Sequence, residues 1–397
     1  MLEANVRELL DVLVRWVHLV AGIMWVGNSL LFNWLDRNLE RDGGGDERHV
    51  GRIWLLHSGG FYDVEKKFLA PSQMPRVLHW FKWQSYTTWM TGVALLTLLY
   101  WTGGASLMID PSVAHLRPGQ AVAIGVGTVV GGWIVYDGLF RLFGRFEAVA
   151  TGLSLAFVVG VVWALTHLLS GRAAFIHVGA MLGTCMAGNV FAHIIPSQRT
   201  LVAATREGRP QDVAVSAHAK QRSIHNNYLT FPLLFTMLSN HFSVITGSQY
   251  AALLLGVLIV GGALVRHWMN VRFSFRAWIP ALAATVVACV AAVAVVVTRG
   301  TPAQASVDGA PVPFSSVQFI LQRRCTPCHS DAPSLVSNPP APDGVRFATA
   351  EDVALWKERI AARAVVTRTM PLNNRTEMTD EERDTLARWL AQGAPTR

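Results

Sequence analysis

The stretch Cys325-Thr326-Pro327-Cys328-His329 has the residue types and the spacing that attach a c-type haem. Two thiols three positions apart bond covalently to the porphyrin edge, and the adjacent histidine supplies one axial ligand of the iron. Cysteine pairs at this spacing also occur in redox dithiols and in zinc sites. The chain has only four cysteines and no second pair to complete a zinc tetrad. We therefore predict a covalent haem c on Cys325, Cys328 and His329, with an unmodified surface cysteine pair as the alternative.

A second axial ligand is expected downstream of this motif. Met370 precedes Pro371, and a proline orders the loop and so reduces the entropy lost when the sulfur is held at iron. Methionine ligation also raises the reduction potential, which suits an acceptor of electrons. We predict His329 and Met370 as the two iron ligands. Met378 is the alternative, and a lone methionine is often a core residue instead.

The composition indicates that these residues belong to a membrane protein. Of 397 residues, 51% are hydrophobic and only 15% are charged, which is too apolar for an ordinary soluble protein. Fourteen tryptophans suit the aromatic belts of a bilayer. The net charge of +8 would suit nucleic acid, but the basic residues gather in particular loops. We attribute them to membrane topology and expect no nucleic-acid partner.

The hydrophobic pattern predicts eight spans, each near the roughly 20 apolar residues that a bilayer core requires. They are 12–34, 84–101, 121–143, 149–170, 173–196, 229–247, 250–268 and 277–298.

The distribution of basic residues predicts the orientation of these spans. The loop between the first two spans carries eight lysines and arginines, from Arg37 to Lys82. The loops on the opposite side carry only Arg117 and Arg172. By the positive-inside rule, the first loop is cytoplasmic and both termini are outside. Haem c is attached on the outer face of bacterial membranes, so this argument also puts the motif in the periplasm. We expect a multi-pass protein of the bacterial inner membrane.

The last spans are followed by a tether and a small domain. Residues 299–313 (RGTPAQASVDGAPVP) are rich in proline, glycine and alanine. Downstream, we expect helices over 314–324, after Thr349 and after Thr379, where Glu382 completes a capping box. The predicted fold is all-α, an eight-helix transmembrane bundle followed by a small class I-like cytochrome c domain. The predicted boundaries are 1–299, 300–313 and 314–397.

Histidines within the spans form an outer and a cytoplasmic layer. His18, His177 and His241 fall in the outer layer, and small residues lie on the same helix faces as the first two. We expect a pair from this layer to hold a haem b, because electrons must reach haem c. The alternative is that each histidine is a structural hydrogen-bonding residue between helices.

The cytoplasmic segments are rich in groups that could bind and oxidise a flat, anionic ring. Cations, amides and aromatic faces cluster in 57–67 and again in 220–228. Interfacial anchoring is the alternative. Asp137 and Arg141, four residues apart, suggest either a salt bridge or an arginine for an anionic substrate. The predicted catalytic residues are His57, Glu65, Lys66, His225 and Asn226.

These stretches resemble the membrane-bound urate hydroxylase family, also described as cytochrome c-linked urate oxidases. The resembling segments follow the same order as in that family and, together with the terminal haem motif, span nearly the whole chain. Ser58 and Ser85 depart from the residues expected at those positions. The matching segments are 16–18, 22–27, 57–67, 79–89, 194–199 and 225–230.

The resemblance implies oxidation of urate to 5-hydroxyisourate. Water would supply the oxygen atom, and electrons would leave through haem c to a soluble or membrane cytochrome c or a terminal oxidase. Two other classes stay open: another membrane dehydrogenase or quinol oxidase feeding haem c, and a non-enzymatic haem electron relay. A quinone-type substrate would require an apolar pocket open to lipid in place of a basic cytoplasmic mouth.

Overall fold

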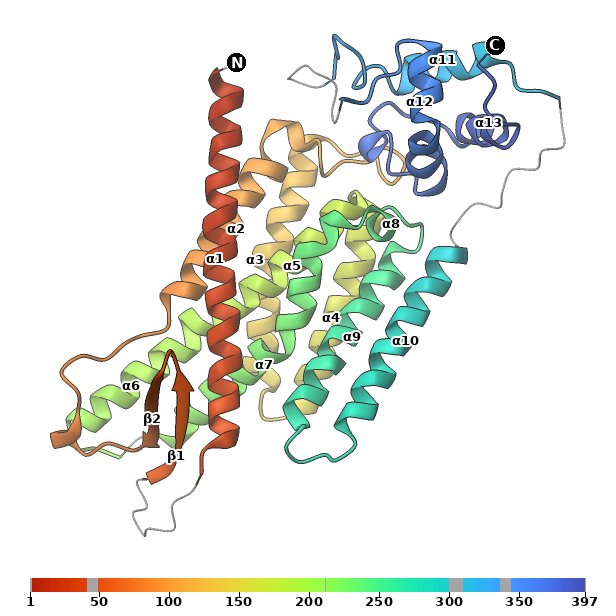
Figure 1. The fold of residues 1–397 in the computed structure, drawn as a ribbon. Helices are drawn as coiled ribbons and strands as arrows, with labels where there is room; N and C mark the ends of the chain where they lie inside the picture. Colours follow the sequence, from red (N-terminus) through yellow and green to blue (C-terminus); the bar gives the residue numbers. More distant parts are fainter. Residues whose placement is uncertain (1, 41–48, 211, 300–309, 336–343, 397) are drawn as a thin grey trace.

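The computed structural model describes residues 2–40, 49–210, 212–299, 310–335 and 344–396, and the described chain is mostly helical. Long helices run side by side, and a separate group of short helices follows them (Figure 1). The bundle helices are α1 (Leu2–Asn38), α2 (Trp83–Leu96), α3 (Pro118–Phe143), α4 (Glu147–Leu168), α5 (Gly171–Asn189), α6 (Ile195–Arg206), α7 (Val213–Leu238), α8 (Ser243–Thr246), α9 (Ala251–Val271) and α10 (Trp278–Arg299).

Six of the described helices are long and apolar enough to cross a membrane: α1, α3, α4, α5 with its continuation, α9 and α10. The other two predicted spans correspond to α2 and α7. Helix α2 has only 14 residues before the π turn η2 (Thr97–Trp101), and α7 carries several polar residues along its length. Both nevertheless pack within the bundle, α2 against α1 and α5, and α7 against α5 and α9. Their crossing of the membrane stays a prediction.

The two ends of the bundle carry different structures (Figure 1). The start of α1 and the C-terminal helices lie at one end, which we call the C-terminal-domain end. The strands β1 (His49–His57) and β2 (Gly60–Lys67) and helix α6 lie at the other, the hairpin end. Because the start of α1 and the C-terminal helices lie at the same end, the chain must run through the bundle an even number of times.

The all-α prediction is wrong for residues 49–67, which form an antiparallel hairpin. Strand β1 pairs with β2 so that Arg52 lies opposite Glu65 and His57 opposite Gly60. Ser58 and Gly59 form the two-residue turn, with φ of 51° and 76°. A two-residue hairpin turn with positive φ at both positions matches the twist of its strands and favours glycine. The Ser-Gly pair therefore signalled a turn between strands rather than a glycine-rich loop.

The segment predicted as a cytoplasmic loop over 197–228 is also mostly helical. Helix α5 continues through the π turn η4 (Val190–Ile194) directly into α6. Pro196 lacks the N–H that would close a regular turn, and a widened turn before a proline accommodates that loss. Helix α7 begins after Asp212, whose carboxylate caps the N–H groups of Ala214 and Val215. Residues 213–228 are therefore helical and packed in the bundle.

The C-terminal residues have an apolar core of their own. Helices α11 (Phe314–Arg324), α12 (Ala350–Ile360) and α13 (Asp380–Ala391) enclose Val317, Val353, Leu386 and Trp389. The three predicted helix positions are confirmed, as is the capping box that begins at Thr379. A second capping box, between Thr349 and Asp352, begins α12 and was not predicted. The predicted tether lies largely outside the described residues. The predicted domain boundaries stay predictions.

Candidate functional site

Seven polar side chains from three helical segments meet inside the bundle toward the hairpin end. Helix α3 contributes two of them, the α5–η4 segment two, and α7 three. We call this set the Arg222 cluster: Tyr136, Asp137, Asn189, His193, Arg222, His225 and Asn226.

Asp137 is the charged centre of the Arg222 cluster. Its carboxylate accepts hydrogen bonds from Arg222 Nη2 at 2.8 Å and from Arg141 Nε at 2.6 Å. His193 Nε2 lies 2.6 Å from the same carboxylate. Arg222 is fully buried, whereas the Arg141 side chain is 65% exposed. The salt bridge predicted between Asp137 and Arg141 is confirmed, and it links a buried ion pair to the surface.

An uncharged network lies beside this ion pair. Tyr136 Oη lies 2.7 Å from His225 Nδ1 and accepts a hydrogen bond from Asn189 Nδ2 at 3.0 Å. Asn189 Nδ2 also donates to Asn226 Oδ1 at 2.8 Å. The Arg222 guanidinium lies 5.1 Å from the centre of the Tyr136 ring. Two of the predicted catalytic residues, His225 and Asn226, are thus in one connected network.

The Arg222 cluster keeps polar groups without a protein partner. Arg222 uses Nη2 for Asp137, while Nε and Nη1 have no hydrogen-bond partner in the described part of the chain. The same holds for Asn189 Oδ1. Buried polar groups are almost always hydrogen-bonded, so unpartnered ones need an explanation. Unpartnered guanidinium N–H donors and an amide acceptor in the same cluster match a planar anion that carries both acceptors and N–H donors.

The other three predicted catalytic residues lie on the hairpin and are exposed. His57 Nδ1 lies 2.6 Å from Ser58 Oγ, and Glu65 pairs with Lys67 at 2.6 Å. Lys66 pairs with Asp36 at the end of α1. Among the described residues, no hydrogen bond or ion pair joins these three side chains to the Arg222 cluster. The structure therefore separates the predicted catalytic set into two places.

An ion pair also joins the two hairpin strands. Arg52 on β1 donates to both carboxylate oxygens of Asp63 on β2, with Nε 2.5 Å from Oδ1. This hydrogen bonding holds the pKa of the Asp63 carboxyl below its ordinary value. The charged side chains Arg52, Asp63, Glu65, Lys66 and Lys67 of the hairpin are therefore all in ion pairs, within the hairpin or with α1.

The C-terminal Cys-x-x-Cys-His residues lie on one backbone turn. The backbone turns helically after α11, where the His329 N–H donates to Cys325 O at 2.8 Å. Both thiols and the imidazole therefore come from one turn. His329 Nδ1 lies 3.0 Å from Val345 O, an arrangement that orients Nε2 toward a metal. Burial raises the pKa of the Cys325 thiol to about 12. These residues fit a haem c.

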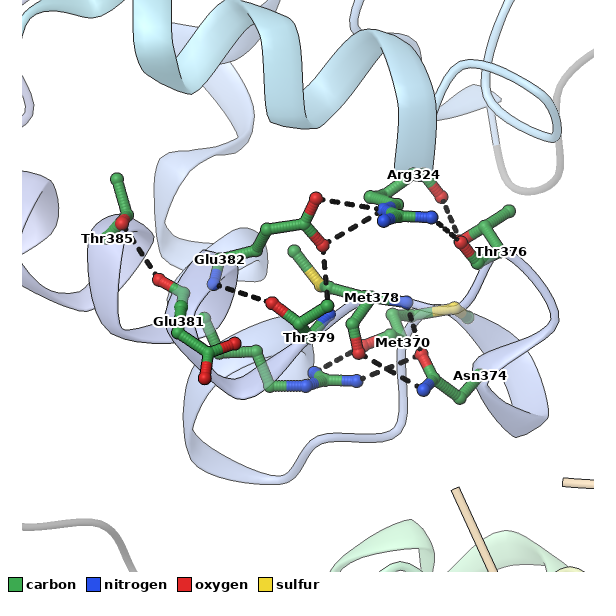
Figure 2. A network of polar contacts seen from close by, with 10 residues as sticks. Arg324, Met370, Asn374, Thr376, Met378, Thr379, Glu381, Glu382 and Thr385 are labelled. Carbon is green, nitrogen blue, oxygen red and sulfur yellow. Dashed lines mark hydrogen bonds and ion pairs between the residues drawn. The ribbon is translucent and has the colours of Figure 1, made fainter. Parts of the chain in front are cut away.

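The two candidate methionine ligands differ in their surroundings (Figure 2). Met370 is half-buried, its N–H donates to Arg363 O at 3.0 Å, and its carbonyl accepts from Arg383 Nη1 at 2.9 Å. Met378 is only 3% exposed and belongs to the apolar core. Met370 thus has a backbone fixed on both sides and a side chain that the core does not use. Its assignment as ligand stays a prediction.

The three predicted haem b ligands do not assemble into one pair. His177 is fully buried, with Nδ1 2.8 Å from Ala173 O and Nε2 accepting from Trp101 Nε1 at 3.0 Å. His18 packs against α2 through Nδ1, 2.9 Å from Thr88 O. His241 is exposed. In the described chain, no ring contact or hydrogen bond joins any two of these three. His18 and His177 hydrogen-bond to residues of neighbouring segments, and the haem b assignment stays a prediction.

Asn189 and Arg222 belong to the site but were not predicted as site residues. Arg222 and Asn226 are four residues apart, so on a helix they share one face. That signal is readable only if 213–228 is treated as helix. Asn189 lies in a mostly apolar helix, and His193 four residues later is the signal that could have marked it.

The fold and the site define a mostly helical protein, with six helices that could cross a membrane and a buried polar cluster between them. The family model described as urate oxidase N-terminal matches residues 4–298. The chain therefore belongs to the urate oxidase N-terminal family, which implies a urate-related oxidoreductase. The match includes the hairpin and the whole Arg222 cluster and ends before α11. No curated protein and no solved structure matches the chain.

Proposed function

We propose that the protein is a membrane-bound urate hydroxylase. Urate and water are converted to 5-hydroxyisourate, two electrons and two protons, so water supplies the new oxygen atom. The electrons leave through haem c on the C-terminal domain to a soluble or membrane cytochrome c or a terminal oxidase. The chain spans a bacterial inner membrane eight times, with both termini and the haem domain in the periplasm.

One observation carries the choice of site: among the described residues, the buried Arg222 has two guanidinium nitrogens that make no hydrogen bond to the protein. Urate is a flat anion with ring oxygens that accept hydrogen bonds and ring N–H groups that donate them. The Arg222 donors and Asn189 Oδ1 are complementary to that edge. The cluster lies toward the hairpin end, where the basic first loop is, and urate is produced in the cytoplasm.

The proposed roles within the chain follow from these contacts. Arg222 and Asn189 hold the substrate, and Asn226 fixes the Asn189 amide by accepting its N–H at 2.8 Å. His225, whose Nδ1 is held by Tyr136, is a candidate general base for the attacking water. His57, Glu65 and Lys66 remain alternative candidates on the hairpin.

A contact at the other end of the bundle supports electron exit toward the C-terminal domain. Asn373 Nδ2 donates to Ser106 O at 3.1 Å. Asn373 follows Met370 by three residues, and Ser106 lies in the loop that begins just after Trp101. Trp101 in turn donates to the buried His177. Cys325, Cys328, His329 and Met370 would hold the haem, which accepts one electron at a time when bound.

The test is reduction of haem c by urate in the purified protein without oxygen. We expect the absorption bands of reduced haem c to appear on adding urate, and label from ¹⁸O-water to enter the product. Reduction by a quinol but not by urate would contradict the proposal and favour a quinol oxidase. Reduction by neither, with haem c intact, would favour an electron relay. Separately, Met370→Ala should remove the weak far-red iron–sulfur band, whereas Met378→Ala should not.

A further inference from the structure

Three titratable side chains form a continuous chain from the Arg222 cluster toward the surface. Asp137 Oδ1 lies 2.6 Å from His193 Nε2, and His193 Nδ1 lies 3.2 Å from His218 Nε2. Each imidazole therefore has one nitrogen on the inner side and one on the outer side of the chain. Asp137 and His193 are nearly buried, with side chains 10% and 9% exposed, and His218 is half-buried near the start of α7.

The local backbone is arranged to bring His193 into this chain. His193 lies on the π turn η4, where the helix widens before Pro196. Single π turns are rare and frequently occur at functional sites. Its ring also lies near Trp133, with centroids 6.1 Å apart, so the imidazole has packing on one side and hydrogen-bonding partners at both nitrogens. This arrangement holds both nitrogens in line.

We propose that Asp137, His193 and His218 form the path by which protons leave the substrate site. The inference rests on the proposed function, because oxidation of urate releases two protons for the two electrons that haem c accepts. A proton on the Asp137 carboxylate passes to His193 Nε2, while the proton on Nδ1 moves to His218 Nε2. His218 then releases its Nδ1 proton to solvent. Two such passages remove both protons. After each passage the proton of each imidazole is on Nε2, and the rings must return it to Nδ1 before the next passage.

The charges around the chain suit movement outward. Arg222 from α7 contacts the inner oxygen of Asp137, and Arg141 from α3 contacts the other oxygen from the surface. Two cations on one carboxylate favour its charged form, so a proton that arrives there is passed on rather than kept. Burial and the positive charge of Arg222 lower the pKa of His218, which disfavours a lasting positive charge on that ring.

A purely structural role for the same residues predicts different behaviour. Asp137 and His193 would then only lock α3 to the α5–η4 segment, and their loss would reduce the amount of folded protein. A relay residue instead changes the rate and its pH dependence while urate binding and haem content stay the same.

The test compares His193→Gln and His218→Gln with His267→Gln in the purified full-length protein. His267 is a suitable control, since it is half-buried toward the same end and its Nδ1 lies 2.9 Å from Tyr228 Oη, outside the Arg222 cluster. Stopped-flow reduction of haem c by urate is measured from acid to alkaline pH, together with urate affinity by equilibrium dialysis. We expect the two relay variants to be about 100-fold slower at neutral pH. Their affinity for urate should stay unchanged.

Imidazole added to His218→Gly should restore at least part of the rate, because this residue is the one closest to solvent. A wild-type rate and pH profile in both relay variants would overturn the relay and leave the proposed function standing. A loss of urate affinity equal to the loss of rate would also overturn it, in favour of a structural role. A wild-type protein that does not oxidise urate would overturn the proposed function itself.

Discussion

The hairpin and the Arg222 cluster contain the same kinds of side chain but use them in opposite ways. On the hairpin, the Arg52 and Lys67 side chains are well exposed and paired with the carboxylates of Asp63 and Glu65. In the cluster, Arg222 is fully buried and satisfies only part of its donor capacity with Asp137. Exposed ion pairs contribute little and are screened by water. A buried cation with spare donors is costly unless a ligand completes it. Of the two places, the cluster is therefore the one suited to bind an anion.

The largest expected effect is that of changing Arg222. Arg222→Lys keeps the charge but loses the planar pair of donors, so kcat/KM for urate should fall about 10²–10³-fold. The matched hairpin variant Lys66→Met should change kcat/KM by less than about threefold, because Lys66 contributes only an exposed ion pair. Steady-state haem c reduction by urate measures both, with haem content as the control for folding. Equal losses of kcat/KM in the two variants would show that the Arg222 cluster is no more important for urate oxidation than the hairpin.

A second comparison separates the two candidate bases. His225→Gln should lower kcat about 100-fold if His225 takes a proton from water, because general-base catalysis contributes this much. His57→Gln should leave kcat within about twofold, because in the described part of the chain the His57 ring hydrogen-bonds only to the neighbouring Ser58. Rates are compared at saturating urate. A larger loss in His57→Gln than in His225→Gln would move the chemistry to the hairpin.

Changing Arg141 tests whether an exposed arginine beside the buried cluster takes part in binding urate. Arg141 reaches Asp137 from the surface with a side chain that is 65% exposed. Arg141→Gln should change thermal stability by about 0.5 kcal/mol or less, as exposed pairs typically do. KM for urate should rise no more than about threefold, because Arg222 holds Asp137 without it. A tenfold or greater rise in KM would instead make Arg141 the arginine that binds the substrate.

The smallest expected effect concerns the acid stability of the hairpin. The Arg52 hydrogen bond lowers the pKa of Asp63 below its ordinary value of 3.8. A carboxyl with a lowered folded pKa stabilises the folded state above the unfolded pKa, and that contribution is lost as pH falls through the folded pKa. Protease resistance of the hairpin should therefore persist to below pH 3.8 and weaken at lower pH. Asp63→Asn should remove this pH dependence.

The sequence predicted some elements of this fold well because their signals are local. The helix start after Thr349, the capping box at Thr379 and the apolar runs of six helices depend on neighbouring residues only. The hairpin was missed because its charged residues suggested a loop, although Ser58-Gly59 is a turn pair.

The candidate site was predicted only in part, for a physical reason. His225 and Asn226 were found in a polar stretch, but their partner Asn189 lies 37 residues away from Asn226 in the chain. Arg222 is suited to bind an anion because it is completely buried. Tertiary packing creates this burial, so the sequence alone does not reveal it. The same packing left His57, Glu65 and Lys66 on the surface.

The most direct test of the account is the position of urate in a structure of the complex. Chemically reduced haem c cannot accept electrons, so the bound substrate would remain unoxidised in the absence of oxygen. We predict density for a flat ring within hydrogen-bond distance of Arg222 Nε or Nη1 and of Asn189 Oδ1. Density for urate against the hairpin residues His57 to Lys67, with none beside Arg222, would contradict the account.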